Sequence, residues 1–96
     1  MAKPPTVEIS PEELETLFRV LEIWSKIHDH RLTSAAIPSR RLPSHGHPGA
    51  VSDILRHENS ASYHVATTHR ITGQDGSVPH WDAKDIHIGN IVIWTK

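Results

Sequence analysis

The sequence predicts an α+β domain in which a capped N-terminal helix and a short second helix pack on an antiparallel sheet of three or four strands. Three observations support this fold class. A chain of 96 residues is the size of one domain with a modest core. A helix N-terminus is encoded at Ser10, and residues 63–96 alternate between β-prone segments and turns.

The composition limits both the core and the class of protein. Only 36% of the residues are hydrophobic. A chain with so few hydrophobic residues often covers only one face of its sheet or completes its core with a second copy. The absence of cysteine excludes a disulfide framework and a thiolate zinc site. The longest apolar run, residues 91–94, is too short to span a membrane, and the first ten residues lack the apolar region of a secretory signal. We therefore expect a soluble, cytoplasmic protein without a membrane partner.

Charge is unevenly distributed, although the formal net charge is only −1. Residues 1–30 have a balance of −3, whereas residues 31–72 have a balance of +3. The middle segment is therefore the candidate anion-facing surface, and we expect Arg40, Arg41 and Arg56 to hold a phosphate backbone there. The chain also has nine histidines, which would add positive charge below about pH 6.5.

The chain divides into segments of different composition. We expect a flexible lead-in over residues 1–7 and a single domain over residues 8–96, made of a helix (8–30), a connection rich in Pro, Arg and His (31–48), a short helix (49–59) and the sheet (63–96). Three prolines and no usable periodicity indicate that the connection is irregular, with at most a short extended piece near residues 35–37. The second helix would open at Pro48, with Val51, Ile54 and Leu55 spaced i, i+3 and i+4.

The first helix has a complete N-terminal signature. Ser10 is the expected N-cap, Pro11 takes the first helical position, and Glu13 completes a capping box with Ser10. The apolar residues that follow cover more than half of the helix circumference, which is wider than the stripe of roughly 100° that a one-sided surface helix needs. One side is expected to pack on the sheet, and the other side therefore needs a second partner.

That second side of the helix carries Val20, Ile23 and Ile27. Its partner is either the 32–55 region of the same chain or another protein. Because the chain is poor in apolar residues, our leading hypothesis is a small binding or regulatory module that acts through a protein partner or as a homodimer. These three residues are the predicted partner interface.

The first strand of the sheet is predicted over residues 63–72. Side chains alternate along a strand, so His64 and Arg70 are expected to share the outward face. The expected inward face consists of Tyr63, Val65, Thr67, His69 and Ile71.

The rest of the sheet is expected to fold back from a turn at residues 73–76. Residues 77–81 would return antiparallel, followed by a tight bend around residues 82–84. In the last segment, Gly89–Asn90 is either a two-residue hairpin turn or a bulge in one long strand, and we prefer the bulge because each hairpin arm would be only about four residues long. Both alternatives place four isoleucines on one face: Ile86, Ile88, Ile91 and Ile93.

An alternative hypothesis is a histidine-dependent, metal-independent ribonuclease, with RNA as the substrate. Such an enzyme needs a general base, a general acid and a cation that stabilises the charged transition state. The candidate catalytic residues are His64, Arg70, His80, Asp82 and His87. The order of a helix, a second helix and three strands resembles that of the small toxin ribonucleases of toxin–antitoxin modules. No motif assigns the chain to that family, and whether it is an enzyme stays open at this point.

A third hypothesis is a histidine-rich metal-binding domain. His45 and His47 flank a single glycine, and on an extended segment both imidazoles would point to one side as a pair of metal ligands. A third ligand has to come from elsewhere in the chain, such as His57, His64 or Asp82, and His57 completes the predicted set. We expect no organic cofactor, and a divalent metal ion only if these histidines converge.

Overall fold

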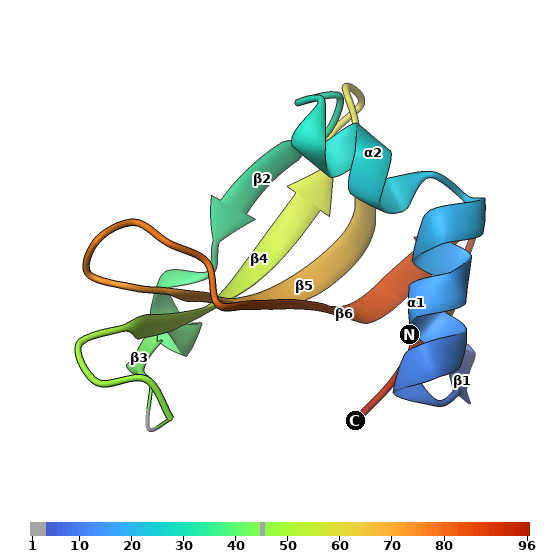
Figure 1. Ribbon diagram of the computed structural model, residues 1–96. Helices are drawn as coiled ribbons and strands as arrows, with labels where there is room; N and C mark the ends of the chain where they lie inside the picture. Colours follow the sequence, from blue (N-terminus) through green and yellow to red (C-terminus); the bar gives the residue numbers. More distant parts are fainter. Residues whose placement is uncertain (1–3, 45) are drawn as a thin grey trace.

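The computed structural model describes residues 4–44 and 46–96 (Figure 1). Its elements are β1 (Thr6–Glu8), α1 (Pro11–Val20), α2 (Ile23–His28), β2 (Thr33–Ala36), a 3-10 turn η1 (Pro38–Arg40), β3 (Leu42–Pro43), β4 (Val51–Glu58), β5 (His64–Thr72), β6 (His80–Ile88) and β7 (Ile91–Trp94). The strands form one sheet in the order β1-β7-β6-β5-β4-β2, and β3 pairs with β4. The pairing of β1 with β7 is parallel and the other pairings are antiparallel.

The predicted α+β class is confirmed. The expected sheet of three or four antiparallel strands is wrong, because the sheet is mixed and has seven strands.

The two helices lie together at one side of the curved sheet (Figure 1). Their buried residues join apolar side chains from the centre of the sheet in one core. The members of this core are Leu14, Phe18, Ile23, Ile27, Leu32, Ala66, Ala83 and Ile86. No helix within residues 4–44 and 46–96 is long and apolar enough to cross a membrane.

The N-terminal capping box is confirmed. The Ser10 hydroxyl accepts a hydrogen bond from the Glu13 backbone N–H at 3.1 Å, and the Glu13 carboxylate accepts one from the Ser10 N–H at 3.0 Å. The expectation of one helix over residues 8–30 is wrong, because Glu22 has a left-handed φ of 59° and separates α1 from α2. The expected lead-in is also too long, since Thr6–Glu8 pairs with β7; its residues 1–3 lie outside the described ranges.

The break at Glu22 determines which residues of the predicted partner interface are buried. Ile23 and Ile27 are each only 4% exposed and pack in the core, whereas Val20 is 67% exposed. The chain itself therefore covers two of the three residues on which the prediction of a protein partner or homodimer rested. That hypothesis has lost its main structural argument.

The predicted second helix over residues 49–59 is wrong, because β4 occupies this segment. The buried residues of β4 alternate at Asp53, Leu55 and His57, which is the period of a strand. Two of these three are polar, so the alternation was hidden from a search for apolar residues. The connection over residues 31–48 is likewise more ordered than expected, since it contains β2 and β3, both paired with β4.

Two β-bulges determine which side chains of β5 and β6 lie on each face of the sheet. The register of β4 and β5 pairs His57 with Ala66 but Glu58 with His64, so Val65 is an extra residue. His64 and Arg70 were expected to share the outward face, but this bulge places them on opposite faces of the sheet. The predicted inward face of β5 is wrong, because Ala66 and Thr68 are 0% exposed and face the helices.

The second bulge lies in β6. Thr67 pairs with Asp85 and Thr68 with Ala83, which makes Lys84 the extra residue. The expected bend over residues 82–84 is therefore a bulge within a continuous strand, and the expected return strand over residues 77–81 starts only at His80.

The end of the sheet is a hairpin rather than one bulged strand. Gly89 and Asn90 form a two-residue turn between β6 and β7, and Gly89 has a φ of 58°, which glycine adopts without steric cost. Our preference for the bulge was wrong. The register pairs Ile86 with Ile93 and Ile88 with Ile91, which confirms that the four isoleucines share a face.

Glu15 links both helices to the β6 bulge. Its carboxylate accepts a hydrogen bond from the Ala83 backbone N–H at 3.0 Å and another from the Trp24 indole N–H at 2.8 Å. We expect Glu15→Ala to lower the free energy of unfolding by about 2 kcal/mol, because the buried Ala83 N–H loses its acceptor. Urea denaturation measures this change. The exposed Glu12 on the same helix is the control, and Glu12→Ala should cost less than about 1 kcal/mol; equal losses in the two variants would contradict the link.

Candidate functional site on the open face of the sheet

The sheet face opposite the helices collects polar side chains from β4, β5 and β6. We call it the open face and define it by Ser52, Arg56, Thr67, His69, Asp82 and Asp85. The register places Thr67 opposite Asp85 and His69 opposite Asp82, so these side chains are cross-strand neighbours. The open face carries two clusters, each made of two histidines and one aspartate.

The first cluster consists of His64, Asp85 and His87. The rings of His64 and His87 stack with their centroids 4.0 Å apart. The Nε2 atom of His87 lies 3.2 Å from Oδ1 of Asp85. This carboxylate oxygen is buried and has no hydrogen-bond partner among the described residues, and the ring of His87 is the polar group beside it.

A backbone carbonyl selects the tautomer of His64. The Nε2 atom lies 3.0 Å from the carbonyl oxygen of Ala66 and 2.8 Å from Oγ1 of Thr67. A carbonyl can only accept, so Nε2 carries the hydrogen and Nδ1 of the neutral ring keeps its lone pair. Burial lowers the pKa of His64 below its ordinary value of 6.5, and the charge of a protonated His87 lowers it further. His64 is therefore a neutral imidazole near pH 7 with a basic nitrogen available.

A surface cavity of about 410 Å³ borders this histidine pair. Arg56 and Tyr63 line it together with His64 and His87. The Nε atom of Arg56 pairs with Glu58 at 2.7 Å, and within the described ranges no hydrogen bond occupies its two terminal nitrogens. The Tyr63 hydroxyl donates to the carbonyl of Gly89 at 2.6 Å, which ties the start of β5 to the β6–β7 turn.

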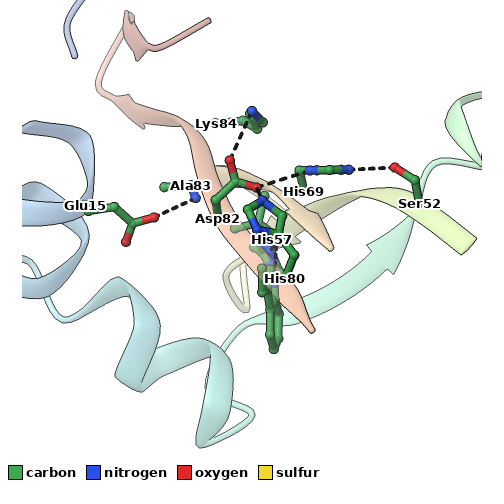
Figure 2. A network of polar contacts seen from close by, with 10 residues as sticks. Glu15, Ser52, His57, His69, His80, Asp82, Ala83 and Lys84 are labelled. Carbon is green, nitrogen blue, oxygen red and sulfur yellow. Dashed lines mark hydrogen bonds and ion pairs between the residues drawn. The ribbon is translucent and has the colours of Figure 1, made fainter. Parts of the chain in front are cut away.

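The second cluster consists of His69, His80 and Asp82, and Figure 2 shows it around the carboxylate of Asp82. Oδ1 of Asp82 lies 3.2 Å from Nδ1 of His69 and 3.0 Å from Nε2 of His80, and Oδ2 lies 3.1 Å from the amine of Lys84. The hydroxyl of Ser52 lies 2.6 Å from the other ring nitrogen of His69. The neighbouring Ala83 N–H points the other way, toward Glu15 and the helices (Figure 2).

The candidate catalytic residues thus separate into three places. His64 and His87 meet at the cavity, and His80 meets Asp82 in the second cluster. Arg70 lies on the helix side, with its guanidinium 5.4 Å from the centre of the Trp81 ring. Arg70 does not share a face with His64, because the bulge at Val65 moves His64 to the open face.

The predicted anion-binding arginines do not form one surface. Arg56 lines the cavity on the open face, and Arg40 is exposed in η1. Arg41 pairs at 3.4 Å with Asp53, whose side chain is buried and belongs to the helix side of β4. Arg56 is therefore the member of this set that accompanies the histidine pair.

The predicted metal ligands are not supported as a set. His45 lies outside the described residues, and His47 sits in an exposed loop. His57 is fully buried, with one ring nitrogen 2.6 Å from the hydroxyl of Ser34 and the other 2.8 Å from the hydroxyl of Thr68. Both of its nitrogens are occupied, so His57 is a structural residue of the sheet.

Two members of the clusters were missed in the sequence. Asp85 stands two residues before His87 on one strand, just as His80 stands two residues before Asp82, and this spacing was sufficient to find it. His69 was assigned to the interior, and nothing in the sequence shows that Asp82 lies opposite it. No protein family, curated protein or solved structure matches the chain.

Proposed function

We propose that this protein cleaves RNA by metal-independent phosphoryl transfer at the cavity bordered by His64, His87 and Arg56. The observation that carries the proposal is that two histidines in different electrostatic settings and an arginine surround one cavity.

The chemistry assigns one role to each histidine. Nδ1 of neutral His64 takes the proton of a ribose 2′-hydroxyl, and the 2′-oxygen attacks the adjacent phosphorus. The bond between phosphorus and the 5′-oxygen breaks, and protonated His87 gives its proton to that oxygen from the ring nitrogen that does not face Asp85. The products are a 2′,3′-cyclic phosphate and a free 5′-hydroxyl.

Arg56 and Asp85 support these steps electrostatically. The terminal nitrogens of Arg56 supply positive charge to the phosphate oxygens as negative charge develops on them. The Asp85 carboxylate lies 3.2 Å from Nε2 of His87 and orients the ring. Tyr63, exposed at the cavity wall, offers a ring on which a base can stack.

The test is incubation of the purified protein with a mixed-sequence RNA oligonucleotide and with its DNA counterpart, both in EDTA. We expect cleavage of the RNA to fragments ending in 2′,3′-cyclic phosphate, identified by mass spectrometry, and intact DNA, which lacks the 2′-hydroxyl. His47→Ala, in an exposed loop, should cleave at the wild-type rate. RNA that stays intact between pH 5 and pH 8, or cleavage that EDTA abolishes, overturns the proposal.

A further inference from the structure

We propose that His69, His80 and Asp82 form a binding site for a divalent transition-metal ion, with zinc as the representative ligand. This site shares no residue with the cavity and does not depend on the proposed cleavage reaction. Two imidazole nitrogens and a carboxylate oxygen are a donor set that suits zinc and its neighbours in the first transition row, whereas magnesium and calcium prefer oxygen ligands.

The spacing of the donor atoms already approaches that of a metal site. One oxygen of Asp82 lies 3.2 Å from Nδ1 of His69 and 3.0 Å from Nε2 of His80, and the three donor atoms lie within 4.8 Å of one another. In a tetrahedral zinc site with bonds of 2.0–2.1 Å, donor atoms are about 3.3 Å apart. Small side-chain rotations are therefore enough to place an ion between the three atoms.

The backbone holds these residues in place. His69 and Asp82 are direct partners in the β5–β6 register, and His80 precedes Asp82 by two residues on the same face of β6. All three ligands thus come from two hydrogen-bonded strands rather than from a loop. Sites on paired strands keep their geometry better than loop sites do.

Further contacts orient two of the three ligands, as outer partners do in metal sites (Figure 2). Ser52 lies 2.6 Å from Nε2 of His69, so this nitrogen can donate its hydrogen to the hydroxyl while Nδ1 keeps the lone pair that binds metal. Lys84 contacts Oδ2 of Asp82 at 3.1 Å, which leaves Oδ1 to the two histidines. His80 is about half exposed, so a fourth position of the ion is open to water.

The His64–Asp85–His87 cluster is the competing location, because it has the same donor types. It differs in that the Nε2 atom of His64 is engaged by Ala66 and the rings of His64 and His87 stack on each other. Stacked rings must separate before both can direct a nitrogen at one ion. The second cluster needs no such rearrangement, and single substitutions distinguish the two locations.

Isothermal titration of the tag-free protein with zinc chloride at pH 7.5 tests the assignment. We expect saturable binding to the wild type, at least a tenfold loss of affinity in His80→Ala, and a loss of about 10- to 100-fold in Ser52→Ala. His87→Ala, which removes a ligand of the competing cluster, should keep the wild-type affinity. Magnesium chloride should give no binding heat.

Thermal unfolding gives a second readout that does not depend on any activity. Saturating zinc should raise the unfolding midpoint of the wild type and of His87→Ala, but not that of His80→Ala. Circular dichroism without metal shows whether each variant is folded. The proposal is overturned if the wild type and His80→Ala bind zinc equally, or if His87→Ala rather than His80→Ala loses binding.

Discussion

Replacing His64 by alanine is expected to slow RNA cleavage by about 10²- to 10⁴-fold, which is the usual contribution of a positioned general base. The structure gives a physical reason for this size of effect. The Ala66 carbonyl fixes the tautomer of His64, and the partly buried ring borders the cavity. An alanine leaves water as the base, which is neither held in place nor matched in basicity. Initial rates on a fluorogenic RNA oligonucleotide measure the change.

The pH dependence separates loss of a base from loss of structure. Only the neutral form of His64 accepts a proton, and its pKa is lowered below 6.5. The wild-type rate should therefore rise with pH through a value below 6.5, and this rise should disappear in His64→Ala. An unchanged rate in His64→Ala would show that another group accepts the proton, and a retained rise with pH would show that the titrating group is not His64.

The parts of the fold that local interactions determine were predictable from the sequence. The capping box at Ser10 and Glu13 involves residues three apart, and it forms as expected. The four-isoleucine face also follows from strand alternation alone, whichever way Gly89 and Asn90 are arranged. In both cases the deciding contacts lie within a few residues of one another.

The strand β4 was mistaken for a helix because its interior is partly polar. Asp53 and His57 are 3% and 0% exposed, although both residue types are more often found at the surface. Their burial depends on partners that are distant in sequence, namely Arg41 for Asp53, and Ser34 and Thr68 for His57. A search for apolar periodicity registers only Val51, Ile54 and Leu55 and therefore favours a helix.

Most residues of the candidate site could be predicted from the sequence, but their arrangement in space could not. His64, His80, Asp82 and His87 were all named as candidates, and all four lie in the two clusters. Their placement on a single face depends on two bulges, at Val65 and at Lys84, because one extra residue moves every preceding side chain to the other face. Bulges arise from pairing between strands, so a single strand does not reveal them.

The two faces of the sheet hold their histidines in opposite ways. His57, on the helix side, has both ring nitrogens bonded to hydroxyl groups, and it has no contact with solvent. The open-face histidines keep at least one ring nitrogen at a cavity or beside a carboxylate. Burial of a neutral ring favours the folded state near pH 7, whereas partial exposure permits proton transfer and metal binding. The same residue type is therefore part of the interior on one face, and on the other it carries the proposed proton transfer and metal binding.

The protonation of His57 is expected to cost about 3 kcal/mol of folding stability between pH 7 and pH 4. Burial lowers the pKa of His57 from 6.5 to about 4 in the folded protein, and the positive charges of His64 and Arg70 add to this effect. Between these values the unfolded chain binds a proton at His57 and the folded protein does not, so the free energy of unfolding falls as the pH falls. A separation of about 2.5 pKa units corresponds to about 3 kcal/mol.

Urea denaturation of the wild type and of His57→Gln, at pH values from 7 to 4, isolates this contribution. Glutamine keeps polar atoms between Ser34 and Thr68 but does not titrate, so the variant should be less stable at pH 7 and lose less stability on acidification. The stability difference between the two proteins should shrink by about 3 kcal/mol across the window. His47→Gln, at an exposed position, is the control. Its free energy of unfolding should differ from that of the wild type by an amount that stays constant within about 0.5 kcal/mol across the same pH range. The prediction is contradicted if the difference in unfolding free energy between wild type and His57→Gln does not change from pH 7 to pH 4. That result would mean that His57 is protonated equally in the folded and unfolded states, although it is fully buried between two hydroxyl groups in the folded protein.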